Sequence, residues 1–176
     1  MTKTILHSFA LVLMVAGFSF SQKRPGPPVP YIDRGACPFE CCTYREWNVV
    51  KPTALRRSMR DSSPVILRLR TGQKVQGVTG VVITTEPGIV EAIKQTTVDS
   101  LKVNPGDRVY VLTNLGEGYA KVWFKGRVLQ GEPYDESIFK PIRQTKSVWW
   151  VKIKDRRGRI GWSREPENFD NVDQCG

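Results

Sequence analysis

The chain has 176 residues, a formal net charge of +10 and a single histidine, His7. A chain of this length usually folds as one domain, or as two small domains that share a core. The positive charge favours anionic partners such as wall polymers, lipid headgroups or acidic glycans, and the alternative is that it serves only to keep the protein soluble.

The first 21 residues are predicted to be a signal peptide. Lys3 supplies the positive start, an apolar run extends from Ile5 to Phe20, and small residues precede a cleavage point after Ser21. An uncleaved N-terminal anchor is the alternative. The rest of the chain has no apolar run of membrane-spanning length. We therefore expect a secreted or periplasmic protein with no membrane span after cleavage and no nucleic-acid partner.

Cleavage would remove the only imidazole. The remaining 155 residues would carry a net charge of +9 and no histidine. This excludes Ser-His-Asp and Cys-His catalysis, histidine-ligated zinc and any histidine general base. The chain also lacks the Gly-x-Ser-x-Gly, phosphate-loop and His-Glu-x-x-His motifs. We expect no enzyme activity, no cofactor and no metal.

Four cysteines lie beyond the expected cleavage point, at Cys37, Cys41, Cys42 and Cys175. An even number of cysteines in an exported protein indicates two disulfides. A bond between the neighbours Cys41 and Cys42 would be strained. Cys175 is therefore expected to pair with Cys41 or Cys42, and Cys37 with the other. A zinc site of four thiolates fits neither the compartment nor the spacing.

The first half of the chain begins with a linker and continues as short strands. Four prolines in residues 22–30 favour an extended linker, and a cysteine loop follows at 31–43. Alternating apolar residues and turn residues then predict strands at 44–50, 65–70, 74–79, 81–85 and 89–94. One helical turn is the alternative for 89–94. The segment 55–64 is basic and rich in turn residues.

The second half is predicted to contain two hairpins. Strands at 108–113 and 119–125 are joined around Gly116-Glu117-Gly118, and strands at 147–154 and 159–162 are joined by a turn at 155–158. Residues 130–147 have no clear period and are predicted to be an inserted loop. No window has a sustained helical period, so we expect little helix.

These elements predict an all-β protein with one or two small antiparallel barrels. The expected divisions are the signal peptide at 1–21, the linker and cysteine loop at 22–43, and β subdomains at 44–100 and 101–176. Leu69-x-x-Gly72-x-x-Val75 has the same spacing as Val103-x-x-Gly106-x-x-Val109. This repeat fits either two related barrels or one elaborated barrel.

Two stretches of the sequence resemble the bacterial SH3 (SH3b) domain family. The first resembles the opening pattern of the family and reads Leu55-x-x-Ser58-x-x-x-x-Ser63-Pro64-Val65-Ile66-x-x-Leu69-x-x-Gly72-Gln73-x-Val75. The second resembles the closing pattern and comprises Gly106–Val122 and Gly158-x-x-Gly161-Trp162. The two stretches cover about half of the chain after the signal peptide. Trp123, the 130–147 loop and the cysteine-rich start have no counterpart in the family pattern.

The resemblance implies SH3-like barrels in an exported, non-catalytic binding module. Domains of this family often bind peptidoglycan or wall-associated peptides and are often fused to a wall hydrolase. We therefore expect the partner to be an anionic cell-wall polymer or an envelope protein. A purely structural or protein-interaction role is the alternative.

A ligand-binding face is predicted from the alternation of two strands. The apolar sets Ala120/Val122/Phe124 and Trp149/Val151/Ile153 should face the core. The opposite set would present aromatic rings for stacking beside ammonium groups, and consists of Tyr119, Trp123, Trp150, Lys121 and Lys152. The alternative is that these rings pack under the inserted loop or between two barrels. Trp47 and Trp162 are expected in the core.

Two basic clusters are further candidates. One is Arg56, Arg57 and Arg60, and the other surrounds the last turn and comprises Lys152, Lys154, Arg156, Arg157 and Arg159. They could form an anion-binding rim, or they could prevent a strand edge from pairing with other chains.

An acidic patch near the C-terminus gives the last alternative. It comprises Glu165, Glu167, Asp170 and Asp173. Two of these carboxylates could serve a glycan hydrolase, which needs a pair across a cleft. Asp170, Asn171 and Asp173 could also hold calcium, although the segment lacks a known calcium-loop pattern.

Overall fold

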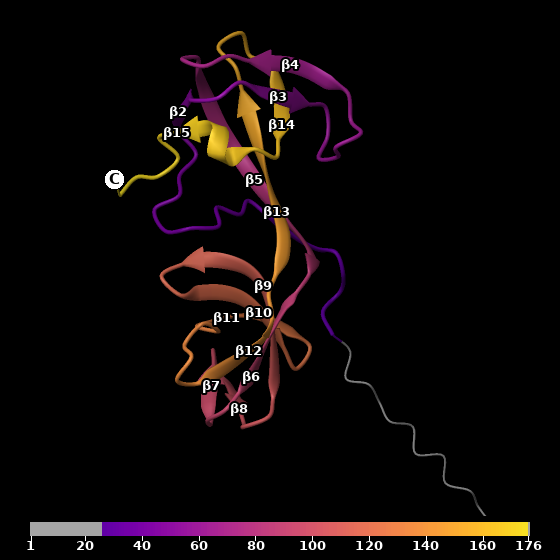
Figure 1. Cartoon of the computed structure of the whole chain (residues 1–176), viewed down its shortest axis with the longest axis vertical. Coiled ribbons are helices and arrows are strands. Elements are labelled where there is room, and N and C mark those ends of the chain that lie inside the picture. The colour runs from indigo at the N-terminus through magenta and orange to yellow at the C-terminus, as the bar shows by residue number, and fades with distance from the viewer. Residues whose placement is uncertain (1–25, 176) are drawn as a thin grey trace, which may run out of the picture.

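The computed structural model describes residues 26–175, so the predicted signal peptide lies outside the described residues. The described chain is an antiparallel all-β protein with a curled half-barrel sheet and a second sheet (Figure 1). The fold class therefore agrees with the alternating apolar pattern of the sequence.

The large sheet has eight strands and curls into the half-barrel. Seven strands pair in the order β15 (Phe169–Asp170), β2 (Glu46–Val49), β5 (Lys74–Glu86), β13 (Lys146–Lys154), β14 (Ile160–Ser163), β3 (Thr53–Arg56) and β4 (Val65–Leu69). The eighth strand, β1 (Tyr31–Arg34), pairs with the second half of β5. β4 is therefore the last strand on one side of the sheet.

The second sheet has five strands. Its order is β11 (Arg127–Gly131), β10 (Tyr119–Phe124), β9 (Arg108–Gly116), β6 (Gly88–Ala92) and β12 (Phe139–Arg143). A separate hairpin is formed by β7 (Thr96–Val98) and β8 (Leu101–Val103).

The second sheet is inserted between two paired strands of the first. β5 and β13 pair from Lys146↔Glu86 to Lys154↔Gln76. β6 follows β5 directly, and β12 directly precedes β13, so all strands between them in sequence belong to the second sheet or the hairpin. Figure 1 shows β5 and β13 extending together from the large sheet toward the smaller one. The sheets therefore do not divide the chain at residue 100, because the large sheet takes strands from both sides of that position.

Gly88 lies where the outgoing and returning segments come together. A Cβ atom at this position would lie 2.5 Å from Oγ1 of Thr145 and 3.2 Å from the carbonyl oxygen of Arg143. The guanidinium of Arg143 donates to the carbonyl of Pro87 at 2.8 and 3.1 Å. Glu86-Pro87-Gly88 is therefore a passage between sheets, and glycine allows the close backbone approach.

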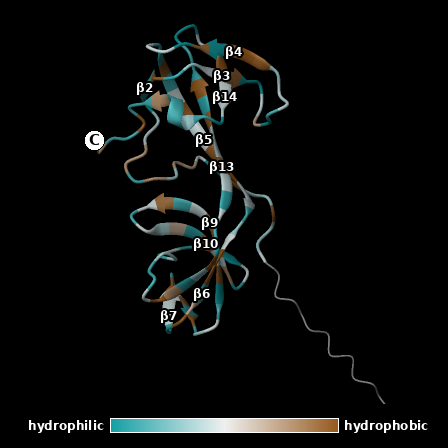
Figure 2. Ribbon diagram, in the orientation of Figure 1, coloured by the Kyte–Doolittle hydropathy of each residue, from teal (hydrophilic) through white to brown (hydrophobic). Residues whose placement is uncertain are grey.

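Each sheet has its own buried cluster. The cluster of the second sheet includes Val109, Val122 and Phe124, and that of the large sheet includes Trp47 and Ile153. Trp47 is fully buried, which confirms its predicted place in the core. Figure 2 shows hydrophobic residues on the strands of both sheets, where they alternate with hydrophilic ones. One solvated face per strand explains this alternation.

Several element boundaries differ from the prediction. The predicted strands at 74–79 and 81–85 form the single strand β5, and the predicted loop 130–147 contains β12. The one helix of residues 26–175 is the 3₁₀ turn η1 (Pro166–Asn168), in agreement with the low expected helix content. None of the helices described in the structure is long and apolar enough to cross a membrane.

Candidate anion-binding site

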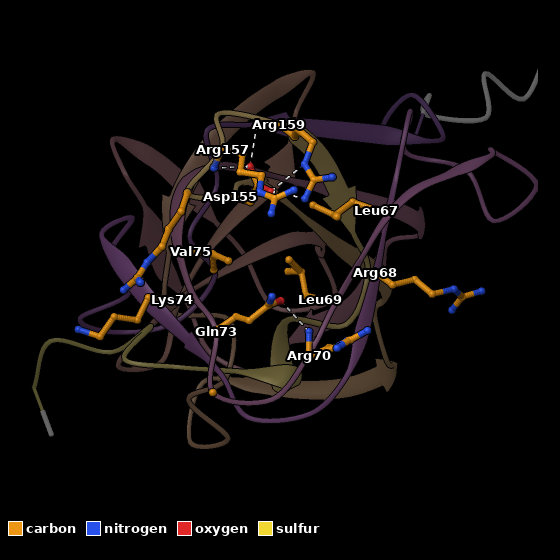
Figure 3. Close-up of a pocket in the computed structure, with 12 residues that line it drawn as sticks. Leu67, Arg68, Leu69, Arg70, Gln73, Lys74, Val75, Asp155, Arg157 and Arg159 are labelled. Atoms are coloured by element: carbon orange, nitrogen blue, oxygen red, sulfur yellow. Dashed lines mark hydrogen bonds and ion pairs between the residues drawn. The ribbon is translucent and has the colours of Figure 1, made fainter.

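A cavity of about 500 Å³ opens at the end of the half-barrel, and we call it the mouth. Figure 3 shows it surrounded by β4, the start of β5 and the turn between β13 and β14. Its lining residues are Leu67, Arg68, Leu69, Arg70, Gly72, Gln73, Lys74, Val75, Asp155, Arg156, Arg157 and Arg159. The mouth thus combines two segments that are about eighty residues apart in the sequence.

The floor of the mouth is apolar. Leu69 and Val75 are each 3% exposed and belong to the core cluster of the large sheet. Figure 3 places both side chains near the centre of the view, with Gln73 beside them. The Gln73 side chain accepts a hydrogen bond from the backbone N–H of Arg70 at 2.7 Å, which fixes the turn between β4 and β5. The end of the core therefore forms the base of the mouth.

The rim of the mouth is strongly basic. Six of its lining residues are cationic, and they are Arg68, Arg70, Lys74, Arg156, Arg157 and Arg159. Figure 3 shows Arg68 and Lys74 extending away from the centre on opposite sides. Lys74 forms an exposed ion pair with Glu46 at 2.6 Å. Within residues 26–175, Arg159 pairs with Asp155, and none of the other four arginines of the rim forms an ion pair with a carboxylate.

Asp155 is the only acidic residue of the rim, and it is already engaged. Its Oδ1 accepts the backbone N–H groups of Arg157 and Arg159 at 3.0 and 2.8 Å, and its Oδ2 lies 2.7 Å from the Arg159 guanidinium. Burial raises the pKa of Asp155, but the hydrogen bonds from Arg159 and Arg157 outweigh it, and the pKa lies below its usual value. This ionised carboxylate holds the turn and neutralises one arginine.

Three guanidinium groups therefore remain without an acidic partner in the described chain around an apolar floor. They belong to Arg68, Arg70 and Arg157, whereas the charge of Arg156 interacts with that of Glu46. A guanidinium group presents a planar fork of donors that matches carboxylate and phosphate oxygens. The arrangement can bind an anionic group on the rim while an apolar part of the same ligand contacts the floor.

The structure divides the side chains of β10 between a buried and a more exposed face, as predicted. Ala120, Val122 and Phe124 are buried in the second core. Tyr119 is 44% exposed and Trp123 is half-buried. These two side chains therefore lie on the opposite face, as the alternation indicates.

Lys121 has a partner that the sequence did not indicate. Its ammonium group lies 2.8 Å from Oδ1 of Asp33 on β1, and the Asp33 side chain is only 6% exposed. Lys121 is thus occupied by an ion pair between the large and the small sheet.

The prediction that Trp150 is open to solvent was wrong, although the side chain lies on the face opposite Val151 and Ile153 as expected. Trp150 is 4% exposed, and its cross-strand partner Val81 is 3% exposed. Both faces of the β5–β13 pair are covered at this point, because Val82, on the other face, is also buried. The rule of one solvated face does not hold there.

Lys152 and Trp162 also differ from the prediction. The Lys152 ammonium lies 5.6 Å from the ring centroid of Trp162, which is half-buried and not in the core. Trp150 and Lys152 belong to the large sheet, whereas Tyr119, Lys121 and Trp123 belong to the second sheet. The structure therefore does not assemble the five predicted residues on one strand face.

The acidic residues near the C-terminus serve local structure. Thr53 donates a hydrogen bond to Glu165, and Asp170 and Asp173 accept the backbone N–H groups of Asn171 and Cys175. The Asn171 side chain itself donates to the carbonyl of Glu46 at 2.7 Å. These contacts fasten the C-terminal segment to β2 and the cysteine loop.

The disulfides join Cys37 to Cys42 and Cys41 to Cys175, with Cα separations of 5.5 and 5.6 Å. This confirms two disulfides and selects one of the two pairings that the sequence left open. The backbone N–H of Gln174 also donates to the carbonyl of Cys41 at 2.9 Å. The end of the chain is therefore attached to the start of the domain both covalently and by hydrogen bonds.

The cysteine loop also contacts the β9–β10 turn of the second sheet. Gly116 has a φ of +100°, and a Cβ atom there would lie 2.4 Å from the backbone nitrogen of Glu40. The neighbouring Glu117 raises the pKa of Glu40 by its negative charge and by a hydrogen bond between the two side chains. Two carboxylates therefore meet where the loop and the turn touch.

We predict that Glu117→Gln raises the melting temperature at neutral pH. The folded-state pKa of Glu40 lies above its ordinary value of 4.5, so its stabilising contribution is full below that value and is lost as the pH rises. Removing the Glu117 charge removes the repulsion and so recovers the lost stability. The difference in melting temperature between the variant and the unmodified chain should therefore vanish near pH 3.

Thermal unfolding followed by circular dichroism at several pH values measures this effect. Glu136→Gln is the matched control, because Glu136 is exposed and has no ion-pair partner in the described chain. An equal shift for both variants, or a shift that does not depend on pH, would contradict the role given to Glu117.

Sequence reasoning found one side of the mouth and missed the other. Arg156, Arg157 and Arg159 were recognised as a possible anion-binding rim, whereas Arg68, Arg70 and Lys74 were not connected with them. The available signal was Val65-Ile66-Leu67-Arg68-Leu69-Arg70, where arginine occupies the polar positions of an apolar strand. Comparisons with protein families, with curated proteins and with solved structures found no match for this chain.

Proposed function

We propose that this chain is an exported, non-enzymatic binding module that holds an anionic partner in the mouth of an SH3-like half-barrel. The observation that carries the proposal is the group of three arginines, Arg68, Arg70 and Arg157, without acidic partners in the described chain around the apolar floor of Leu69 and Val75. Uncompensated like charges at one site are unfavourable unless a ligand or salt neutralises them.

The other features of the chain agree with this role. The sequence resemblance to bacterial SH3 domains lies partly in β4 and the following turn, which line the mouth. Two disulfides suit an oxidising compartment outside the cytoplasm. Residues 26–175 contain no histidine, and the only carboxylate of the mouth is engaged by Arg159. The partner would be a cell-wall polymer or an envelope protein with exposed anionic groups.

The test is binding of the full chain to poly-L-glutamate and to purified cell-wall sacculi at several salt concentrations. We expect affinity for at least one of them to fall as salt rises, because exposed charges are screened. A double variant, Arg156→Ser with Arg157→Ser, should bind that probe about tenfold more weakly, since charge-assisted hydrogen bonds are lost.

The matched control removes two charges elsewhere. Arg127→Ser with Lys140→Ser alters exposed residues on the two outer strands of the second sheet, β11 and β12. If the control weakens binding as much as the mouth variant does, only the overall charge matters and the proposed site is wrong. If neither probe binds at low salt, the proposed function is wrong.

A further inference from the structure

β4 offers an unpaired strand edge. It pairs with β3 on one side and is the last strand of the large sheet on the other. Its first residues are partly open to solvent, with Val65 and Ile66 38% and 39% exposed. In an antiparallel pair, every second backbone N–H and C=O points away from the partner strand. Within the described chain, no second strand pairs with those groups of β4.

The same strand forms one wall of the mouth. Leu67, Arg68 and Leu69 of β4, followed by Arg70, all line it. Arg68 and Arg70 have no ion-pair partner in residues 26–175. The free backbone groups of β4 and the guanidinium groups without ion-pair partners therefore lie along the same stretch of the chain.

We infer that β4 accepts an extended acidic peptide as an added strand, and this inference rests on the proposed function. Such a strand would lie about 4.8 Å from β4 and form backbone hydrogen bonds with its free edge. Successive side chains of a strand point to opposite faces. Carboxylates on one face would meet Arg68, and the side chains on the other face would enter the mouth above Leu69.

Charge complementarity favours this occupant over two others. A second copy of the chain would carry the same net charge of +10 and would bring a second Arg68 to the edge. Like charges that face each other across strands are destabilising. Residues 1–25 contain lysine and arginine but no aspartate or glutamate, so this segment cannot supply the anionic groups either. An acidic segment from another protein supplies both the charge and the strand.

The experiment compares two synthetic peptides of equal charge, about eight residues long, in which glutamate alternates with threonine. One has an ordinary backbone, and the other is N-methylated at every second residue, which removes the donors of one edge. We expect the full chain to bind the ordinary peptide at least about tenfold more tightly, because strand addition depends on backbone hydrogen bonds. Amide hydrogen exchange in Val65–Leu69 should slow when that peptide binds.

The protein variants separate the edge from overall charge. Arg68→Glu should weaken binding of the ordinary peptide about tenfold or more, and Arg127→Glu on the outer strand β11 should change it less than about twofold. Fluorescence anisotropy with labelled peptide measures both.

Three outcomes would overturn the inference. Equal binding of both peptides, with loss in Arg68→Glu, leaves the anion-binding function standing and removes strand addition. Failure of both peptides removes strand addition, and if poly-L-glutamate and the sacculi also fail to bind, the proposed function is removed as well. Protection of Val65–Leu69 that increases with protein concentration in the absence of peptide assigns the edge to a second copy.

Discussion

Replacing Lys121 with methionine is expected to lower the free energy of unfolding by about 3 kcal/mol. The side chain of Asp33 is 6% exposed, and within residues 26–175 its Oδ1 has one hydrogen-bond and ion-pair partner, Lys121, at 2.8 Å. Its Oδ2 is buried without a hydrogen-bond partner in the described chain. Without Lys121, the Asp33 carboxylate would be a buried charge with no compensation, which is why the loss exceeds that of a surface pair. Chemical denaturation measures it.

Two controls distinguish this explanation from a general loss of packing. Lys74→Met breaks a pair whose side chains are 50% and 56% exposed, so it should cost no more than about 1 kcal/mol. The double variant Lys121→Met with Asp33→Asn removes the buried charge and should recover part of the stability. If the double variant is less stable than Lys121→Met alone, the carboxylate does not cause the loss.

The same ion pair bears on how the two sheets are joined. Asp33 belongs to β1, which pairs with β5, whereas Lys121 belongs to β10 of the second sheet. A second contact comes from Thr84 of β5, whose hydroxyl donates to the carbonyl of Leu112 at 2.5 Å. The second sheet is thus attached to the large sheet through β1 as well as through β5 and β13. Replacing Lys121 should therefore lower the stability of both sheets.

Local patterns in the sequence were sufficient to predict most of the longer strands. β4, β9, β10 and β13 begin within one residue of their predicted starts. Each has alternating residues and is bounded by glycine or another turn residue, so local information determines it. Short strands such as β3 and β12 were missed, because a few paired residues carry too little pattern.

The insertion of one sheet into the other could not be read from local pattern. Glu86-Pro87-Gly88 has the composition of a tight turn, and a tight turn would keep the next strand in the same sheet. Only the pairing of β5 with β13, which are separated by about sixty residues, reveals that the chain leaves the large sheet at this position and returns. Pairing over such distances depends on side-chain packing throughout both sheets.

Only one half of the candidate site could be predicted from the sequence, for the same reason. The arginines at 156, 157 and 159 lie in one turn and are visible as a cluster. Arg68 and Arg70 are brought to them by the curl of the large sheet, which no sequence spacing records. The aromatic face failed differently, because it assumed that the two strands β10 and β13 belong to one sheet and that one face of each is open to solvent.

Removing the disulfide between Cys41 and Cys175 is expected to cause the largest loss of stability. The two residues are 134 positions apart. Closing a loop of this length removes conformational entropy from the unfolded chain worth about 5 kcal/mol as an upper value. Cys41→Ser with Cys175→Ser should therefore lower the free energy of unfolding by about 3–5 kcal/mol, measured by denaturation under oxidising conditions.

The matched control is Cys37→Ser with Cys42→Ser, which opens a bond between residues only 5 positions apart. The same entropy relation gives about 2 kcal/mol for this short loop, so the long bond should cost roughly twice as much. The folded C-terminal segment keeps other anchors, since Phe169 is in the core and Arg45 donates to the carbonyl of Asn171. Both double variants should therefore fold. Equal losses for the two would show that the bonds stabilise the folded loop itself, and that the length of chain they close does not determine their contribution.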